Sequence, residues 1–144
     1  MTAPHERYRT FLETLTLETL DRLTDHVTPD VRFKDPFNDV RGADAMARVF
    51  RHMFANVDNI RFTVHHSMAS GDTGLMSWRF EGMLSGKVWS FEGTSVITFA
   101  PDGRVAEHID YWDAASQFYE RFPVIGWLLV ALRRRLAVRG VSDS

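Results

Sequence analysis

His108 and Asp110 stand two residues apart in residues 105–112, a segment whose alternating pattern predicts a β-strand. Side chains two positions apart lie on the same face of a strand, so the imidazole and the carboxylate would be neighbours, beside the indole of Trp112. Because histidine changes charge close to neutral pH, such a pair could accept and return a proton. The alternative is a surface strand that carries solvated polar side chains.

Asp35 is a second carboxylate that could act as a general base. It ends a predicted strand at residues 31–35, and Pro36 favours extended backbone at the residue that precedes it. The alternative is a strand-end aspartate that accepts hydrogen bonds from the following loop, a common role for this residue type.

Arg79 and Glu81 form another charged pair on one face of a predicted strand. Trp78 and Phe80 alternate with them and give the opposite face a more apolar character. We therefore expect Arg79 and Glu81 to form an ion pair on the outer or dimer-forming face of the sheet, where it would contribute little if exposed.

His65 and His66 have the residue type of metal ligands. Adjacent residues of a strand face opposite sides, however, and the sequence places no third ligand nearby. The absence of cysteine also excludes thiolate zinc sites and cysteine nucleophiles. We expect neither a metal ion nor a cofactor.

The elements that must position these residues follow from the spacing of the apolar side chains. Spacings of three and four over the first 27 residues, with a bend near 14–18, predict two helices, and a third is predicted at 43–56. Alternation then predicts four strands on short turns, at about 60–69, 74–84, 87–100 and 104–112. Strands on such short connections are antiparallel neighbours.

Length and composition limit the class of protein. The 144 residues correspond to one domain, and 44% hydrophobic with 25% charged residues is ordinary for a globular protein. The net charge of −2 argues against a general nucleic-acid binder. With no leader segment and no apolar run of membrane-spanning length in the sequence, we expect a cytoplasmic protein.

The last predicted helical segment, residues 114–138, combines an apolar block at 124–130 with Arg133, Arg134 and Arg135. One hypothesis is a helix that lies at a membrane surface, where tryptophan and arginine are both common. The favoured interpretation is a helix that closes a barrel or covers a neighbouring subunit, with its arginines at the negative end of the helix dipole.

Several local motifs occur in a characteristic order. They are Val31-Arg32-Phe33-Lys34-Asp35-Pro36 after two helices, a third helix led by Gly42, and Thr98-Phe99-x-x-Asp102-Gly103-Arg104-Val105 followed by Asp110-Tyr111-Trp112-Asp113. From about Tyr8 to Phe122 the chain resembles the nuclear transport factor 2-like superfamily, in particular its SnoaL-like and ketosteroid isomerase-like branch.

This resemblance implies a single α+β domain over residues 1–144. Its expected form is a cone-shaped barrel in which a curved antiparallel sheet is wrapped on three helices, with residues 114–138 as a helical tail that closes the barrel or the dimer. Members are often homodimers, here through the outer face of the sheet, and have a deep apolar pocket.

The resemblance also implies roles for individual residues. Asp35 matches the general base of the isomerases, and Asp110 matches an aspartate that positions water in epoxide hydrolase-like members. The Arg79-x-Glu81 step resembles the pair of the hydrolase branch in which an arginine orients a catalytic aspartate, with Glu81 in place of that aspartate. The isomerase oxyanion hole is incomplete here, because its tyrosine position falls on Phe11 and its acid position on Ser95. Tyr8, one turn earlier, could replace that tyrosine only if the helices were shifted. These differences argue against 3-ketosteroid isomerisation itself.

We therefore expect a protein with a pocket for an apolar polyketide-, terpenoid- or steroid-like molecule. Its activity would be proton transfer of the isomerase or cyclase type, or water addition, with Asp35 or Asp110 as base and His108 as partner. The alternative is a non-catalytic ligand-binding or assembly module of the same fold. The residues expected to contact the substrate are Phe11, Phe33, Trp78, Phe80, Phe91, Ser95 and Trp112.

Overall fold

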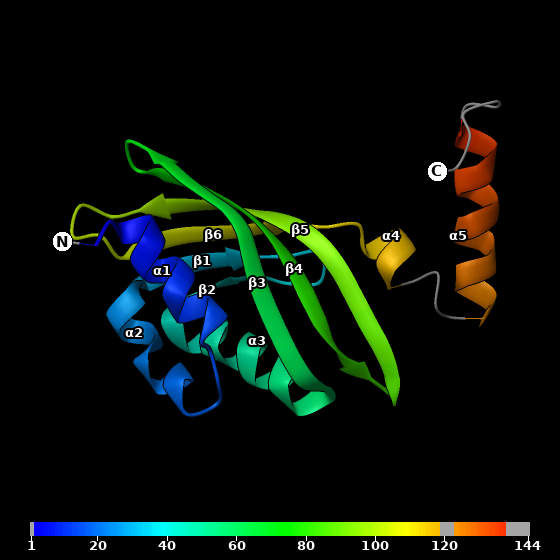
Figure 1. Ribbon diagram of the computed structural model, residues 1–144, viewed down its shortest axis with the longest axis horizontal. Coiled ribbons are helices and arrows are strands. Elements are labelled where there is room, and N and C mark those ends of the chain that lie inside the picture. Colours follow the sequence, from blue (N-terminus) through cyan, green and yellow to red (C-terminus); the bar gives the residue numbers. More distant parts are fainter. Residues whose placement is uncertain (1, 119–122, 138–144) are drawn as a thin grey trace. The chain divides into compact units, whose positions relative to one another are not determined.

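The N-terminal part of the chain forms short helices, as the spacing of its apolar residues predicts (Figure 1). The computed structural model describes residues 2–118 and 123–137. Helix α1 spans Pro4–Glu13, the 3-10 helix η1 spans Thr19–Arg22, and α2 spans Leu23–His26. Proline suits the first turn of α1, because the N–H that it lacks would have no partner within the helix.

Strand β1, Val27–Lys34, begins four residues before the strand predicted at 31–35. Pro29 is tolerated inside it because the pairing of β1 with β6 shifts register between Val27 and Arg32. A short strand β2, Asp39–Arg41, pairs antiparallel with the end of β1, in a segment for which the sequence analysis predicts no strand.

Helix α3 spans Ala43–Asn56, the range that its periodicity predicts. Gly42 precedes it with φ +100°, a backbone conformation that favours glycine because it has no Cβ. The buried side of α3 includes Met46 and Phe50, and the Phe50 ring lies 5.4 Å from that of Phe33 on β1. This contact joins α3 to the sheet.

The remaining strands of the first compact unit are β3 Val57–Ser70, β4 Thr73–Leu84, β5 Lys87–Phe99 and β6 Val105–Tyr111. Within residues 2–112 the sheet has six strands in the order β2-β1-β6-β5-β4-β3. The prediction of a purely antiparallel sheet is wrong at one pair, because β1 and β6 run parallel. Their connection includes the whole β3–β5 meander, so rules for short turns do not determine it.

The sheet is curved and unclosed, and α1, α2 and α3 gather on one side of it (Figure 1). Alternate residues of the strands point toward this inner side and supply most of the core. They include Val64, Met76, Trp78, Phe80, Trp89, Phe91, Ser95, Ile97 and His108. The expected α+β fold, a cone-shaped arrangement of a curved sheet wrapped on three helices, is confirmed.

The expectation for the His65–His66 pair is wrong in one respect. Strand β3 shifts register against β4 between Val64 and His66, so His65 is an extra residue of a β-bulge. Both histidines are exposed and border the same groove on the outer side of the sheet. His66 Nδ1 lies 2.7 Å from the Ser77 hydroxyl. Among residues 2–118 and 123–137, no three potential ligands are grouped for a metal ion.

The second compact unit begins at Asp113. Asp113 caps α4, Ala114–Gln117, by accepting a hydrogen bond from the Ser116 N–H at 3.1 Å. Helix α5, Pro123–Leu136, carries its three arginines in the last turn. Residues 119–122 and 138 of the predicted helical segment lie outside the described residues. In the described part of the chain, the helices are too short or too polar to span a bilayer.

Candidate active site

His108 and Asp110 come together on the inner side of the sheet, as the alternation of β6 predicts. The Nε2 atom of His108 lies 2.6 Å from Oδ1 of Asp110. His108 is only 3% exposed, and the Asp110 side chain is 17% exposed. A solvated surface strand is therefore the wrong interpretation. Of the two groups, Asp110 is the one that a small molecule could reach.

Ser95 and Trp78 extend this contact into the neighbouring strands. Strand register places Ser95 of β5 opposite Asp110 of β6. The Ser95 hydroxyl donates to Oδ1 of Asp110 at 2.5 Å and accepts a hydrogen bond from the Trp78 indole N–H at 2.8 Å. Ser95 is 1% exposed, so it supports the carboxylate from within the core.

Tyr8 reaches the same group from α1. Its hydroxyl lies 2.7 Å from Nδ1 of His108, and the side chain is 1% exposed. Burial, and to a smaller extent the charge of Asp110, raise the pKa of the Tyr8 hydroxyl well above its ordinary value. In this position Tyr8 hydrogen-bonds a histidine and does not supply the oxyanion donor of an isomerase.

Asp35 lies beside this cluster because of the parallel pairing of β1 with β6. Lys34 lies opposite Ile109, so the residues that follow them, Asp35 and Asp110, come at the same level of the sheet. Its Oδ1 accepts hydrogen bonds from the backbone N–H groups of Phe37 at 2.8 Å and Asn38 at 2.7 Å. The loop-binding role considered from the sequence is therefore present.

The pKa of Asp35 is nevertheless raised. Burial is the main cause, and the negative charge of Asp110 acts in the same direction, while the hydrogen bonds from Phe37 and Asn38 oppose both. The two carboxyl groups thus influence each other electrostatically. The protonated form of Asp35 is therefore available at higher pH than that of an exposed aspartate.

Aromatic rings surround the polar cluster. Phe33 lies 5.1 Å from the His108 ring, and Phe91 stacks on Trp112 at 4.2 Å. Further ring contacts connect Phe91 with Trp78, Phe80 and Trp89. Contact of these residues with a substrate stays a prediction.

Phe11, also expected to contact the substrate, packs in the helical layer. Its ring stacks on His26 at 4.1 Å and on Tyr8 at 6.3 Å. This placement links α1 to α2, and any contact with a substrate again stays a prediction.

Arg79 and Glu81 lie on the outer face, as the sequence analysis expects. Their side chains form an ion pair of 2.7 Å and are half-exposed, while the alternate residues of the strand, Trp78 and Phe80, are buried. Arg79 also lies 3.8 Å from Glu92 on β5. This pair is separated from Asp110 by the sheet itself.

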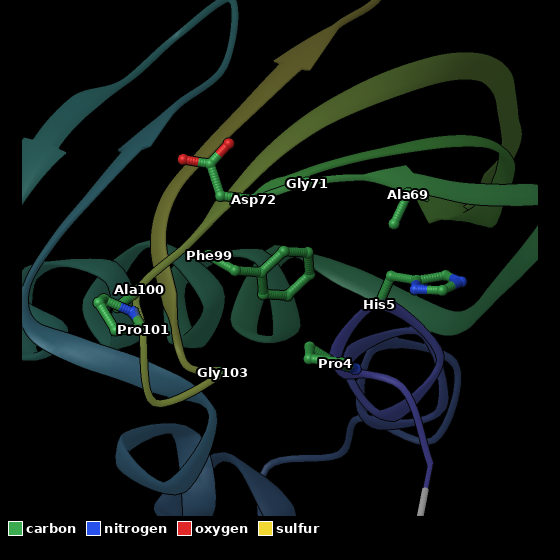
Figure 2. A pocket seen from close by; sticks show the side chains of 9 residues that line it. All are labelled: Pro4, His5, Ala69, Gly71, Asp72, Phe99, Ala100, Pro101 and Gly103. Carbon is green, nitrogen blue, oxygen red and sulfur yellow. The ribbon is translucent and has the colours of Figure 1, made fainter.

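One pocket, of about 350 Å³, lies where α1 begins, beside the β3–β4 and β5–β6 turns (Figure 2). Figure 2 shows the Phe99 ring in the middle of the group and the Asp72 carboxylate directed away from it. None of Asp35, His108 and Asp110 borders this pocket.

Two features of the site were not predicted from the sequence. The sequence places Ser95 and Trp78 on inward faces of adjacent strands, but their hydrogen bond depends on strand register. The contact of Tyr8 with His108 joins residues 100 positions apart. The apolar spacing of α1, which places Tyr8 among the buried residues, was the only available signal.

A curved sheet around three helices defines the chain as an α+β fold of the NTF2-like class. Residues 8–108 match the family of SnoaL-like domains, and the chain belongs to this family. A comparison with curated protein sequences gives no match.

Solved structures share this fold at low sequence identity. An NTF2-like protein of unknown function from Burkholderia pseudomallei has a TM-score of 0.71 and 19% identity, over 80% of this chain and 94% of that one. An LEH-like epoxide hydrolase from M. tuberculosis has a TM-score of 0.68 and 22% identity, over 92% and 96%. A putative SnoaL-like polyketide cyclase from Jannaschia has a TM-score of 0.58 and 20% identity, over 64% and 70%.

The raised pKa of Asp35 has a consequence for stability. A folded-state pKa above the 3.8 of an exposed aspartate means that the folded protein binds more protons than the unfolded chain between the two values. The contribution of Asp35 to stability therefore falls as pH rises through this window. We expect Asp35→Asn to have a larger free energy of unfolding than wild type above the window, with a difference that shrinks toward pH 3.8.

Urea unfolding of both proteins across this pH range measures the difference. Asp39→Asn is the matched control, because the hydrogen bonds and charge of Arg32 hold the pKa of Asp39 below its ordinary value. Loss of the Asp39 carboxylate in Asp39→Asn should lower the free energy of unfolding at neutral pH, and this effect should disappear in acid. If the free energy of unfolding of Asp35→Asn, relative to wild type, changed with pH in the same direction as that of Asp39→Asn, burial would not be the cause of the raised pKa of Asp35.

Proposed function

We propose that this protein is an enzyme that transfers a proton at carbon in an apolar carbonyl compound, of polyketide-, terpenoid- or steroid-like type, without a cofactor. The observation that carries the proposal is the Asp110 carboxylate. One of its oxygens accepts a hydrogen bond from Ser95 and lies 2.6 Å from Nε2 of His108, among aromatic side chains, and a second carboxyl group lies beside it.

In this proposal Asp110 is the general base. Its Oδ1 receives the two hydrogen bonds, and within the described residues no hydrogen bond reaches Oδ2. Oδ2 would take the proton from the carbon next to the carbonyl group and return it to another carbon of the resulting enolate. Both steps use the same oxygen and consume no second reactant.

Asp35 is the proposed acid. Burial raises the pKa of Asp35, so its protonated form is available at higher pH than that of an exposed aspartate, and in that form it would donate a hydrogen bond to the carbonyl oxygen as negative charge develops there. Two neighbouring carboxyl groups in different environments can serve as the acid and the base of one reaction. His108 is buried under Phe33 and so would act through Asp110.

The proposed substrate class follows from the rings around the cluster. Trp112 is partly exposed and lies on Phe91, with Phe37 against its edge at 5.3 Å. Pockets for flat apolar ligands are lined in this way, with a few polar groups that fix orientation.

Proton transfer is favoured over water addition because of Arg79 and Glu81. In the epoxide hydrolase branch that the sequence resembles, an arginine orients a catalytic carboxylate. The corresponding pair in this chain is half-exposed on the outer face and cannot orient a group on the inner side. For epoxide opening, Asp110 and Asp35 would have to hold the attacking water without an arginine to orient them.

Hydrogen–deuterium exchange at carbon tests the proposed reaction. We expect the protein, incubated in D2O with a panel of polyketide-, terpenoid- and steroid-like ketones, to catalyse deuterium incorporation beside the carbonyl group. Asp110→Asn should slow this exchange by about 10²- to 10⁴-fold, because the general base is lost. NMR and mass spectrometry of the recovered ketone measure the rate.

Asp102→Asn is the control, since Asp102 is an exposed carboxylate in the β5–β6 turn. Its exchange rate should equal that of wild type. Unchanged exchange in Asp110→Asn would show that the base lies elsewhere. Ketones that bind wild type and Asp110→Asn equally, without any exchange, would support the non-catalytic binding module.

We also propose a homodimer through the outer face of the sheet. Met68, Leu75, Val96 and Ile109 are successive cross-strand neighbours on β3, β4, β5 and β6, and form an apolar row across this face. Met68 and Leu75 are more than half exposed. Such a row can pair with its own copy across a two-fold axis.

Leu75→Glu tests this interface. We expect wild type to have twice the mass of one chain by light scattering, and Leu75→Glu the mass of a single chain, because an unpaired carboxylate is costly in an apolar interface. Leu17→Glu is the control, since Leu17 has a similar exposure, 53% against 52%, and lies outside the sheet. A single-chain mass for wild type, or an intact Leu75→Glu dimer, would contradict the proposal.

The cytoplasm is the proposed location. A chain without cysteine fits a reducing compartment, where disulfides do not form.

A further inference from the structure

The hydrogen bonds of the acid–base cluster have a defined direction at the Trp78 end. An indole N–H can only donate, so the Ser95 oxygen accepts from it. The Ser95 hydroxyl proton is then directed at Oδ1 of Asp110, which has no proton to offer when it acts as a base.

The direction at the other end is set by Tyr8. Its hydroxyl is buried and retains its proton, and within the described residues Nδ1 of His108 is the hydrogen-bonding atom that it reaches. When Tyr8 donates to Nδ1, the imidazole carries its proton on Nε2, which faces Oδ1 of Asp110. With a proton on Nδ1 instead, the Tyr8 O–H would be buried without an acceptor, at a considerable free-energy cost.

We propose that Tyr8 is a positioning residue that holds His108 in its Nε2–H tautomer, so that two donors fix Oδ1 of Asp110 and leave Oδ2 as the oxygen that accepts the proton. This inference rests on the proposed function for the role of Asp110. The direction of the hydrogen bonds is independent of that function and can be measured on the protein alone.

Removal of the Tyr8 hydroxyl would disturb this order without opening a cavity. In Tyr8→Phe the ring keeps its contacts with Phe11 and His108. Nδ1 of His108 would then be a buried acceptor without a donor, and the Nδ1–H tautomer would become accessible. That tautomer turns a lone pair of Nε2 toward Asp110, so the carboxylate would lose one of its two donors.

The first experiment is NMR of the imidazole nitrogens in ¹⁵N-labelled protein. The chain has six histidines, and the His108 signals are assigned by their loss in His108→Gln. We expect wild-type His108 to show a protonated Nε2 and an unprotonated Nδ1. We expect Tyr8→Phe to shift the Nδ1 signal and to populate the other tautomer.

A wild-type His108 that is protonated on Nδ1 would overturn the proposal, even if Tyr8→Phe did not fold. An unchanged imidazole spectrum in folded Tyr8→Phe would also overturn it. Thr10→Val is the control, because it removes a hydroxyl from the exposed side of the same helix. Its His108 spectrum should match that of wild type.

The second experiment measures the deuterium exchange reaction. Tyr8→Phe should lower kcat by about 10- to 100-fold, the size of effect known for groups that orient a metal-bound imidazole by hydrogen bonding to its second nitrogen. KM should not change, since Tyr8 is too buried to touch a substrate. An equal kcat in Tyr8→Phe and wild type, where Asp110→Asn is inactive, would refute the positioning role alone. Normal exchange in Asp110→Asn would instead refute the proposed function.

Discussion

The arrangement of the inner side of the sheet depends on one oxygen atom, Oδ1 of Asp110. It accepts a hydrogen bond at 2.5 Å from Ser95 on β5 and lies 2.6 Å from Nε2 of His108 on β6, which donates to it in the proposed tautomer. Each of these donors is itself held by a second group, Trp78 on β4 and Tyr8 on α1. A carboxylate can be kept in a mostly buried position only with such partners, because an unpaired buried charge is very costly. The same bonds therefore stabilise the fold and orient the group proposed as base.

The parallel pairing of β1 with β6 adds the second carboxyl group. It places Asp35 beside Asp110 although 75 positions separate them in the sequence, and burial together with the charge of Asp110 raises the pKa of Asp35. The loop that follows Asp35 offsets part of this effect by donating backbone hydrogen bonds. Two carboxyl groups of one residue type thus differ in environment, which is the physical basis for assigning one as acid and the other as base.

The parts of this arrangement that follow from local periodicity could be predicted from the sequence. The helix at 43–56 has the predicted bounds, and strand alternation placed His108 and Asp110 on one face. The parallel β1–β6 pair, the bulge at His65 and the hydrogen bond from Tyr8 could not be predicted, because each depends on register or on packing between distant segments. The motif resemblance supplied the fold, and a shared fold does not determine a reaction.

Neutron diffraction from a deuterium-exchanged crystal tests the central claim most directly, since it locates the protons of the cluster. We expect deuterium on Nε2 of His108 and on the Ser95 hydroxyl, both directed at Oδ1 of Asp110, and none on Oδ2. Deuterium on Nδ1 of His108, or on either oxygen of Asp110, would contradict the account, because the carboxylate would then not be a base held by two donors.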